Sequence, residues 1–310
     1  MENPGILKMI RAPFLSSILA PIFAGTLLSF SINGYINVPA FIIVTITGIG
    51  LHVATNVYND IYDTIQGTDK VNVHRNEASG GSGVLIDNPD LMGRMFFLAR
   101  TGLAVAFAGT VFLTFFIEQS LRPYLWALFL LSAFFSKYYT APPVKLAYRG
   151  LGELSVWFAF GPMAVLIAAI SQNIGFHPRV IMLMPATGIS TLSILLVGQM
   201  IDLEADRKGG KHGVASRLGT RFTAWLYLVV QVLLVMNIIV ISCIYPGTSR
   251  IFLLALVPYI LIFPKAAKII LTGHDEPESL KTGAKLTVLT HIAFSLLLLV
   301  AFIIYIIVNM

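Results

Sequence analysis

The sequence predicts an all-α fold in the form of a polytopic membrane protein, and three observations lead to this fold class. Of the 310 residues, 56% are hydrophobic and only 12% are charged, whereas soluble domains carry roughly a quarter charged residues. The mean hydropathy is +0.82. The charges cluster between long apolar runs, each close to the roughly 20 residues that cross a bilayer as a helix. A soluble globular protein is therefore excluded, and one transmembrane domain over residues 1–310 is expected.

Nine apolar runs are expected to form transmembrane helices. The first run follows Lys8 and Arg11 and continues to about Phe30 without a clear small-residue cleavage site, so it predicts a membrane helix and not a signal peptide. Reading each run against the thickness of the bilayer gives helices at about 14–31, 38–58, 95–117, 123–139, 151–171, 179–201, 222–244, 251–272 and 286–308.

The distribution of basic residues predicts the orientation of these helices. With the N-terminus in the cytoplasm, 18 of the 21 Lys and Arg residues fall on the cytoplasmic side, and three, Arg122, Arg179 and Arg250, fall on the other. Cytoplasmic loops carry such an excess, and an eight-helix count would spoil it. Topology thus explains the formal net charge of +6. No nucleic-acid partner is expected, because no recognisable nucleic-acid-binding motif accompanies the charge.

Acidic residues gather in loops on the same predicted side. The segments 59–94, 202–221 and 273–285 hold twelve of the fifteen Asp and Glu residues, so chemistry is expected on the cytoplasmic face. The acidic segments after the second and sixth helices lie four helices apart. This spacing suggests two four-helix halves followed by a ninth helix.

Each of these two segments places oxygen ligands on one helical face. If the second helix continues through the first segment, one stripe carries, at i, i+4, i+7 and i+11, the residues Asn56, Asp60, Asp63 and Gly67. In the second segment, Asp202 and Asp206 share a face at i and i+4, with Gln199 one turn earlier. Both segments therefore present paired carboxylates with a carboxamide nearby.

Paired carboxylates at the mouth of a membrane bundle repel one another and are costly to desolvate, so their natural partner is a hard divalent cation. Mg²⁺ usually keeps several waters and binds one or two carboxylates together with substrate phosphates. Two facing acidic pairs are thus typical of a cradle for a metal-bound diphosphate. The alternative for one such motif is a solvated helix end whose acids pair with nearby Lys and Arg, and two motifs at matching depths favour the cradle.

Phosphate groups also need cationic donors. The candidates on the same face are Arg11, Lys70, Arg75, Lys145, Arg149, Arg207 and Lys211. For each of them alone, a role in setting the topology is the alternative. Lys145 stands out, because it follows an aromatic and proline-stiffened turn, 138–144, that should hold its ammonium group.

A Gly- and Ser-rich cluster at 79–83 follows the first acidic segment. Glycines let the backbone approach a ligand or form a tight lid, but such a cluster is also typical of a flexible loop, and both interpretations stay open. The cluster lacks the lysine of a phosphate-binding GxxxxGK[ST] loop, so nucleotide hydrolysis is not indicated.

Taken together, these motifs resemble the UbiA superfamily of intramembrane prenyltransferases. The resemblance rests on Asn59-Asp60-x-x-Asp63 near the end of the second helix, on Asp202-x-x-x-Asp206 near the end of the sixth, and on the nine helices, and it spans the whole chain. Enzymes of that superfamily use two aspartate-rich motifs to bind Mg²⁺ and an isoprenyl diphosphate. They transfer the prenyl chain to an acceptor, commonly an aromatic ring, in a chamber between the helices that opens to the membrane lipid.

The resemblance implies roles for particular residues. The implied ligands of two Mg²⁺ ions that bridge the diphosphate are Asp60, Asp63, Asp202 and Asp206. Support for the metal or the diphosphate is implied for Asn56, Asn59, Gln199, Arg11 and Arg149. Lys70 and Lys145 would offset the charge that grows on the leaving diphosphate, and Tyr139 would stabilise an allylic cation through its π face. Trp157 and Phe160 are candidates for the same wall, with ordinary helix packing as the alternative.

A longer pattern is similar to the menaquinone branch of the superfamily, whose members prenylate 1,4-dihydroxy-2-naphthoate with loss of its carboxylate. The pattern comprises Gly67-x-Asp69-Lys70, the run Tyr148–Glu153 and Phe160-Gly161-Pro162. The 4-hydroxybenzoate branch typically has Asp where this chain has Gly67. Because the menaquinone branch usually has Asn and Arg where this chain has Gln199 and Ile201, 4-hydroxybenzoate or another quinone or lipid precursor stays open as the acceptor.

A membrane transporter is the rival interpretation, since intramembrane carboxylates and structural repeats also mark ion pathways. The position of the acids argues against it. They fall at the cytoplasmic ends of the second and sixth helices, whereas a transporter would tend to bury them near the midplane. The sequence therefore favours an enzyme.

Overall fold

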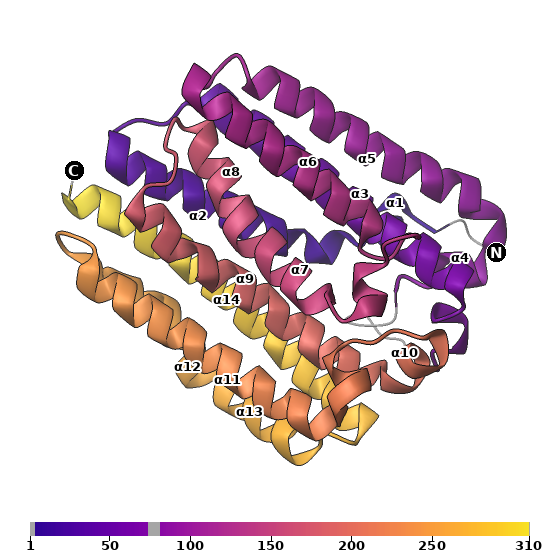
Figure 1. Ribbon diagram of the computed structural model, residues 1–310. Helices are drawn as coiled ribbons and strands as arrows, with labels where there is room; N and C mark the ends of the chain where they lie inside the picture. The colour runs from indigo at the N-terminus through magenta and orange to yellow at the C-terminus, as the bar shows by residue number, and fades with distance from the viewer. Residues whose placement is uncertain (1–3, 74–80, 310) are drawn as a thin grey trace.

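The computed structural model describes residues 4–73 and 81–309, and the regular elements among them are helices, as expected (Figure 1). The α-helices are α1 (Ile6–Met9), α2 (Ser16–Asn33), α3 (Val38–Gln66), α4 (Val84–Asp87), α5 (Met92–Leu113), α6 (Arg122–Tyr138), α7 (Gly152–Phe158), α8 (Ala164–Ser171), α9 (Pro178–Ile201), α10 (Leu203–Gly209), α11 (Val214–Ile244), α12 (Val257–Leu261), α13 (Phe263–Thr272) and α14 (Pro277–Asn309). Short 3₁₀ segments cover Ala12–Leu15, Asp69–Val71, Pro89–Leu91, Gln119–Leu121, Leu146–Arg149 and Ser249–Leu256. A π-helical turn, Ala159–Met163, joins α7 to α8.

Helices occupy all nine expected regions, but fewer of them qualify as membrane spans by length and composition. In the part of the chain that the structure describes, seven helical segments are long and apolar enough to cross a membrane, or eight if one bent pair counts as a single span. The region expected at 123–139 forms α6, which is only 17 residues long. The prediction of a helical membrane protein with several spans is confirmed. The count of nine spans stays a prediction.

The eighth expected helix, 251–272, is not continuous. A 3₁₀ segment leads into α12, and α12 and α13 meet at a bend of 41°. Pro258 and Pro264 each lie in the first turn of one of these helices. A proline has no N–H to donate and its ring clashes with the preceding turn, so it starts a helix more readily than it continues one.

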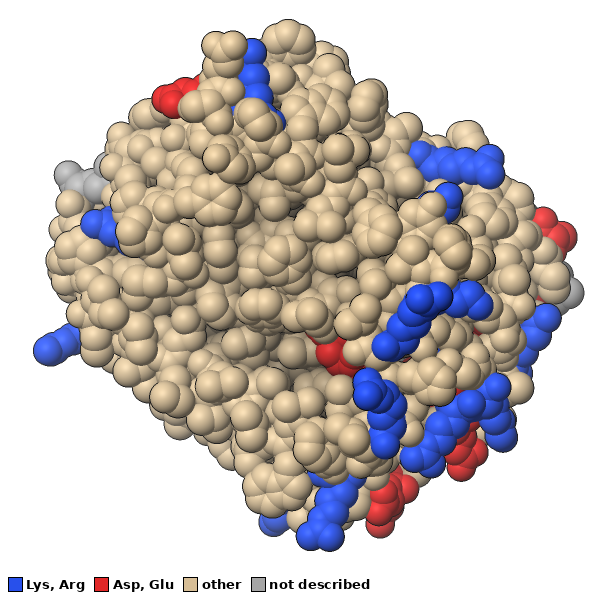
Figure 2. All heavy atoms as spheres, viewed as in Figure 1, with Lys and Arg blue, Asp and Glu red and all other residues tan. Residues whose placement is uncertain are grey.

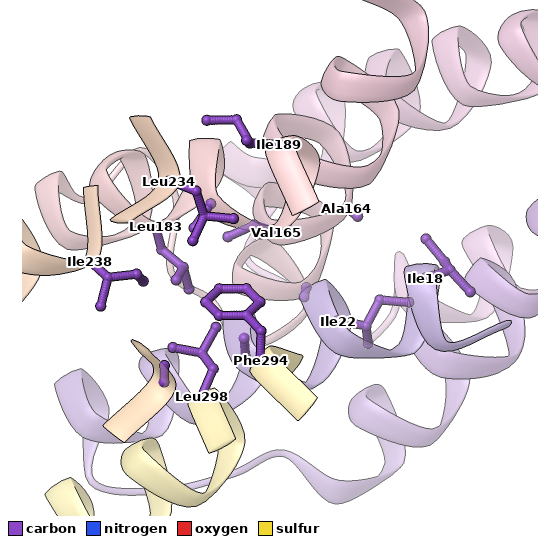
Figure 3. Close-up of a cluster of buried hydrophobic side chains, with 14 of the residues drawn as sticks. Ile18, Ile22, Ala164, Val165, Leu183, Ile189, Leu234, Ile238, Phe294 and Leu298 are labelled. Atoms are coloured by element: carbon purple, nitrogen blue, oxygen red, sulfur yellow. The ribbon is translucent and has the colours of Figure 1, made fainter. Parts of the chain in front are cut away.

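The C-terminal helices pack around one large apolar cluster (Figure 3). In this close-up, Phe294 and Leu298 of α14 point toward Leu183 of α9 and toward Leu234 and Ile238 of α11. Burying each such side chain contributes on the order of 2 kcal/mol relative to exposure to water. Within a membrane, close packing replaces part of that driving force. This cluster fixes α9, which carries the second acidic segment at its end.

In the N-terminal half, α3 and α5 approach each other through glycines. A Cβ atom added to Gly50 would lie 2.6 Å from the carbonyl oxygen of Gly102, and a Cβ added to Gly102 would lie equally close to the carbonyl oxygen of Gly50. Side chains at either position would force the helices apart. Such small-residue contacts are typical of packing between membrane helices, and this contact fixes α3, which carries the first acidic segment.

The short helices α1, α4 and α10 lie at the same end of the bundle, at the right of Figure 1. In the same view, most of the visible Lys and Arg side chains gather at that end, whereas the long sides of the bundle are largely uncharged (Figure 2). The asymmetry of basic residues that the sequence predicts therefore corresponds to one end of the molecule. The two acidic segments lie at this end as well, where α3 and α9 finish.

Candidate active site

A cavity of about 260 Å³ opens between the N-terminal and C-terminal helices. One part of its wall is polar and includes Arg11, Asp63, Asp69, Asp202, Asp206 and Lys211. Another part is apolar or aromatic and includes Ile18, Ile22, Val44, Leu51, Phe135, Tyr139, Phe160 and Ile167. The two acidic segments therefore meet around one space, as the sequence predicts, although 142 residues separate Asp60 from Asp202 in the chain.

The first acidic segment lies on a continuous helix. Asn37 caps the start of α3 by accepting a hydrogen bond from the backbone N–H of Ala40, and Gly67, with φ of +88°, ends the helix. The helix therefore continues through Asp60 and Asp63, which are each only 2% exposed. The predicted stripe of oxygen ligands requires that the helix continue through the first acidic segment, and α3 does so.

Both carboxylates of this helix have partners of opposite charge or hydrogen-bond donors. The backbone N–H of Ser82 donates to both oxygens of Asp60 at 3.2 Å, and Arg11 Nη1 lies 3.8 Å from Asp60 Oδ1. Asp63 accepts from the hydroxyl of Tyr148 at 2.7 Å and from Lys211 Nζ at 2.6 Å. These contacts offset part of the cost of burying the two charges.

The second acidic segment is built differently. The helix α9 ends at Ile201, and α10 begins at Leu203, so Asp202 occupies the break. The backbone N–H of Asp206 still donates to the carbonyl oxygen of Asp202 at 2.8 Å, which preserves the one-turn spacing across the break. Asp206 is 6% exposed, Asp202 is partly exposed, and both line the cavity. Asn72 reaches across from the first segment and donates to Asp202 Oδ1 at 2.8 Å.

Lys211 connects the two segments. Its Nζ lies 2.6 Å from Asp63 Oδ2 and 3.9 Å from Asp206 Oδ1. Burial lowers the pKa of Lys211, but the carboxylates of Asp63 and Asp206 outweigh this effect and raise the pKa well above its usual value. The ammonium group is therefore charged at neutral pH. It lies between the two acidic segments, where it reduces the repulsion between their carboxylates.

One lysine does not balance all of this acidity. Burial and the neighbouring charge of Asp63 together raise the pKa of Asp69 to about 8, although Lys211 acts in the opposite direction. Burial also raises the pKa of Asp206 to about 7, although Lys211 acts in the opposite direction. These shifts mean that the carboxylates would be partly protonated near neutral pH unless more positive charge is present. The oxygen-rich donor set thus fits a hard divalent cation such as Mg²⁺.

No three acidic, His or Cys side chains among residues 4–73 and 81–309 form a preassembled metal cage. A cation held here would therefore share its ligands with water and with the phosphates of a substrate, which is how Mg²⁺ is usually bound. The fit rests on four buried carboxylates, those of Asp60, Asp63, Asp69 and Asp206, and on the positive charge that is missing beside them.

Gly81 and Ser82 of the Gly- and Ser-rich cluster lie against the first acidic segment. Gly81 adopts φ of +71°, and a Cβ atom at this position would lie 2.6 Å from Asp69 Oδ2 and 3.2 Å from Asp60 Oδ1. Only glycine adopts this conformation without strain and also admits the two carboxylates so close to the backbone. At Gly81 and Ser82 the backbone thus lies close to the carboxylates of the first acidic segment. An approach of this loop to a ligand stays a prediction, and Ser79 and Gly80 lie outside the described residues.

Of the four predicted metal ligands, Asp63, Asp202 and Asp206 line the cavity and Asp60 does not. The predicted supporting carboxamides Asn56, Asn59 and Gln199 line it as well. Asn56 donates to the carbonyl oxygen of Ile10 at 3.2 Å, and Asn59 lies one position before Asp60. Gln199 donates to Glu153 Oε1 at 2.8 Å, while its own Oε1 is buried without a hydrogen-bond partner. The carboxamide of Gln199 therefore has an acceptor oxygen available next to the acidic segments.

The predicted cationic and aromatic residues divide into two groups. Arg11, Tyr139 and Phe160 line the cavity. Lys145 and Arg149 instead line a second, more open pocket on the far side of Tyr148. Lys70 is exposed and does not line the cavity, and neither does Trp157. The catalytic role predicted for Lys70 and Lys145 stays a prediction, and Arg75 lies outside the described residues.

Three residues of the site received no role from the sequence. Tyr148 bonds Asp63 and Thr68, Glu153 accepts from Gln199, and Asn72 bonds Asp202. Tyr148 and Glu153 begin and end the run 148–153 that resembles the menaquinone branch, so a signal for them was present. Asn72 follows a short 3₁₀ segment in a loop, and no periodic pattern could have indicated it.

A helical membrane bundle with two acidic segments around one cavity is the arrangement of an intramembrane enzyme. Residues 97–289, more than half of the chain, match the model of the UbiA prenyltransferase family, and the chain belongs to this family. It is therefore a prenyltransferase. The resemblance seen in the motifs is confirmed.

Similar proteins include members of the menaquinone branch. The chain is 27% identical, over 92% of its length and 88% of the relative, to the 2-carboxy-1,4-naphthoquinone phytyltransferase of Synechocystis. It is 25% identical, over 68% of its length and 65% of the relative, to the 1,4-dihydroxy-2-naphthoate octaprenyltransferase of Bacillus subtilis.

Solved structures show the same fold. A UbiA homologue from Aeropyrum pernix has a TM-score of 0.66 at 17% identity, with 94% of this chain and 98% of the homologue covered. A UbiA homologue from Archaeoglobus fulgidus, bound to DMAPP and Mg²⁺, has a TM-score of 0.64 at 15% identity, with 95% and 98% covered. At such identities the likeness concerns the fold alone.

Proposed function

We propose that this prenyltransferase transfers a polyprenyl chain from an isoprenyl diphosphate to 1,4-dihydroxy-2-naphthoate, with loss of the acceptor's carboxylate and with Mg²⁺ as cofactor. The observation that carries the proposal is the meeting of two buried acidic segments, bridged by Lys211, around one cavity with an apolar and aromatic wall. The acidic part suits a metal-bound diphosphate, and the apolar part suits a prenyl chain. Relatives named for naphthoate or naphthoquinone substrates support the choice of acceptor.

In this proposal the donor's diphosphate lies between the two segments. Asp60, Asp63, Asp202 and Asp206 would hold the metal, with Asn56, Asn59 and Gln199 as supporting oxygen donors. When bound, Mg²⁺ supplies charge stabilisation to the leaving diphosphate. Arg11 and Lys211 add positive charge from the protein's own side chains at the same place. Lys70, Lys145 and Arg149 contribute to the positive field through which an anion approaches.

The carbon–oxygen bond of the donor breaks with its electron pair leaving on the diphosphate, and an allylic cation remains. Tyr139 and Phe160 line the cavity and would stabilise this cation through their π faces, by about 1 to 2 kcal/mol for each contact. The apolar wall excludes water, which would otherwise capture the cation. The ring carbon that bears the carboxylate then forms the new bond to the prenyl chain. The bond from this carbon to the carboxylate breaks, CO₂ leaves, and its electron pair returns to the ring.

The arrangement in the membrane belongs to the same proposal. We place the N-terminus and the acidic end of the bundle in the cytoplasm, because the basic residues gather at that end. Nine spans, with α6 as the fourth, would make two four-helix halves plus α14 within a single domain. A chamber that opens between helices toward the lipid would admit the prenyl tail, which is too apolar to enter through water.

The test is an assay of purified protein with Mg²⁺ and geranylgeranyl diphosphate, given 1,4-dihydroxy-2-naphthoate, 4-hydroxybenzoate or no acceptor. Released diphosphate is measured, and products are identified by mass. We expect a prenylated and decarboxylated product with the naphthoate alone. Prenylation of 4-hydroxybenzoate instead would keep the reaction class and refute the proposed acceptor. Inactivity with several donors and acceptors would refute the proposed reaction.

A further inference from the structure

The apolar part of the cavity contains a histidine that the proposed chemistry does not use. His52 of α3 is 4% exposed and lines the cavity, and its Nδ1 is buried without a hydrogen-bond partner. A prenyl chain has no polar atom to offer such a side chain. A buried and unpaired polar nitrogen costs roughly 1 to 3 kcal/mol, so its presence in this wall needs an explanation.

Two hydroxyl groups of the wall are satisfied by the protein itself. Thr55 Oγ1 donates to the carbonyl oxygen of Leu51 at 2.8 Å and lies 2.9 Å from Ser136 Oγ. Thr191 Oγ1 donates to the carbonyl oxygen of Thr187 at 3.2 Å. Among the described side chains that have a buried and unpartnered polar atom, only His52 and Gln199 line the cavity. Gln199 stands beside the acidic segments, so His52 is the one that remains for another polar ligand.

The ring of His52 is held in place. Phe160 packs against it edge to face, with ring centroids 5.2 Å apart. Phe160 belongs to the π-helical turn Ala159–Met163, and such turns often occur at functional sites because they redirect side chains out of the regular helical register. The wall opposite α3 is thus irregular at the position where it meets His52.

The position of His52 along α3 matches the size of an aromatic acceptor. His52 lies four residues before Asn56 and eight before Asp60, on the same helical face. A rise of 1.5 Å per residue places it about 12 Å along the helix from Asp60. With the diphosphate and the first carbon of the prenyl chain nearest Asp60, as the proposed function has them, the remainder of this distance would suit a fused aromatic ring.

We propose that His52 binds an oxygen atom of the aromatic acceptor by a hydrogen bond, and so selects a hydroxylated or carboxylated ring and orients it toward the donor. This inference rests on the proposed function. A neutral histidine accepts a hydrogen bond from a hydroxyl group or donates one to a carboxylate, and acceptor analogues distinguish the two. Sites that pair a substrate's polar atom in this way discriminate strongly against analogues that lack it.

The experiment compares His52→Phe and His52→Gln with the wild-type protein. We expect His52→Phe to raise the KM for 1,4-dihydroxy-2-naphthoate about tenfold or more, with the KM for geranylgeranyl diphosphate changed less than twofold. His52→Gln keeps a hydrogen-bonding group and should recover part of the loss. Equilibrium binding of the acceptor, measured without donor, should weaken in parallel. An unchanged acceptor KM and affinity in both variants would overturn the proposal.

Analogues show which oxygen His52 contacts. Compared with the acceptor, 1-hydroxy-2-naphthoate lacks the 4-hydroxyl group, 4-hydroxy-2-naphthoate lacks the 1-hydroxyl group, and 1,4-dihydroxynaphthalene lacks the carboxylate. We expect the analogue without the contacted group to bind about tenfold more weakly to the wild type, and the additional loss in His52→Phe to be small, because the contact is already absent. Fully additive losses for all three analogues would mean that His52 touches none of these groups and would refute the proposal.

His291 provides a matched control. It belongs to α14 and is also a buried histidine with an unpartnered ring nitrogen, Nε2. Its Nδ1 lies 2.9 Å from Ser190 Oγ, and it does not line the cavity. We expect His291→Gln to leave the acceptor KM unchanged. If His52→Phe fails to fold, judged by lost donor binding, His52→Gln and the analogues decide the question in folded protein. A wild type that prenylates no aromatic ring refutes the proposed function itself, whereas normal turnover with unchanged His52 variants refutes only this inference.

Discussion

The two acidic segments occupy equivalent places in the chain but are built in different ways. The first lies on the continuous helix α3, where Asp60 and Asp63 are each 2% exposed and are held by Arg11, Lys211 and backbone or hydroxyl donors. The second lies at a break between α9 and α10, where Asp202 is partly exposed and is bonded by Asn72. We infer that the first segment is a rigid and desolvated half of the site, and that the second, with Asp202 in the break between two helices, is an adjustable half.

The difference shows that the carboxylates of the two segments act on a ligand with different electrostatic strength. A buried carboxylate on a rigid helix acts at full electrostatic strength, because little water screens it. A partly exposed carboxylate at a helix break is weaker, but it can follow a ligand as the ligand enters or leaves. Substitutions in the first segment should therefore cost more than equivalent substitutions in the second.

The largest effect is expected for the acids of α3. Asp63→Asn should lower Mg²⁺-dependent turnover about a thousandfold, since it removes a buried charge that no neighbour replaces. Asp202→Asn should cost roughly tenfold less. Turnover is measured as diphosphate release during a Mg²⁺ titration. Asp90→Asn, at an exposed site after α4, is the control, and equal losses in Asp63→Asn and Asp202→Asn would contradict the proposed difference between the segments.

Lys211 tests the connection between the segments. Lys211→Met leaves Asp63 and Asp206 without their shared cation, so we expect a loss of about 3 kcal/mol in the free energy of unfolding and about a hundredfold lower turnover. The stability is measured by thermal or denaturant unfolding in detergent.

Lys145→Met is the matched control, because Lys145 lies outside the cavity and its nitrogen rests over the ring of Tyr148 at 5.5 Å. It should change stability by less than about 1 kcal/mol. A larger loss of turnover in Lys145→Met than in Lys211→Met would show that the outer pocket, and not the cavity, holds the essential lysine.

These expectations also show what the sequence could and could not predict. The helical stripe through Asp60 and Asp63 follows from periodicity, and α3 confirms it. That Lys211 and not Lys145 lines the cavity does not follow, because both lysines are near the same end of the bundle and only the turn after α10 decides which one enters the cavity. Sequence spacing reports neighbours along a helix, but it does not report which loop folds inward.

The same limit applies to the break at Asp202 and to Asn72. A spacing of four residues predicts a shared face whether or not the helix is continuous, so the pairing of Asp202 with Asp206 was predictable while the break was not. The hydrogen bond from Asn72 to Asp202 joins residues 130 positions apart, and no local pattern encodes it. Contacts between distant loops depend on how the whole bundle packs.

The backbone over the first segment gives a smaller expected effect. Gly81→Ala introduces a methyl group 2.6 Å from Asp69 Oδ2 at a position with φ of +71°, so the loop must move away from the carboxylates. We expect about a tenfold loss of Mg²⁺ affinity, measured by the Mg²⁺ dependence of turnover. Gly93→Ala, where a methyl group meets nothing within 4 Å, is the control. Unchanged affinity in Gly81→Ala would mean that the loop does not shape the metal site.

The smallest expected effect concerns the adjustable segment. Asn72→Ala removes the hydrogen bond to Asp202 Oδ1 but leaves the carboxylate partly exposed, so water can replace the lost donor and the cost should be only about 1 kcal/mol. This corresponds to about a fivefold loss of Mg²⁺ affinity. Asn33→Ala, which removes a hydrogen bond to the carbonyl oxygen of Gln172 at the other end of the bundle, should leave the affinity unchanged. If Asn72→Ala lowered turnover as much as Asp63→Asn does, the second segment would have to be as rigid as the first, because a carboxylate that can adjust keeps its function after one donor is lost.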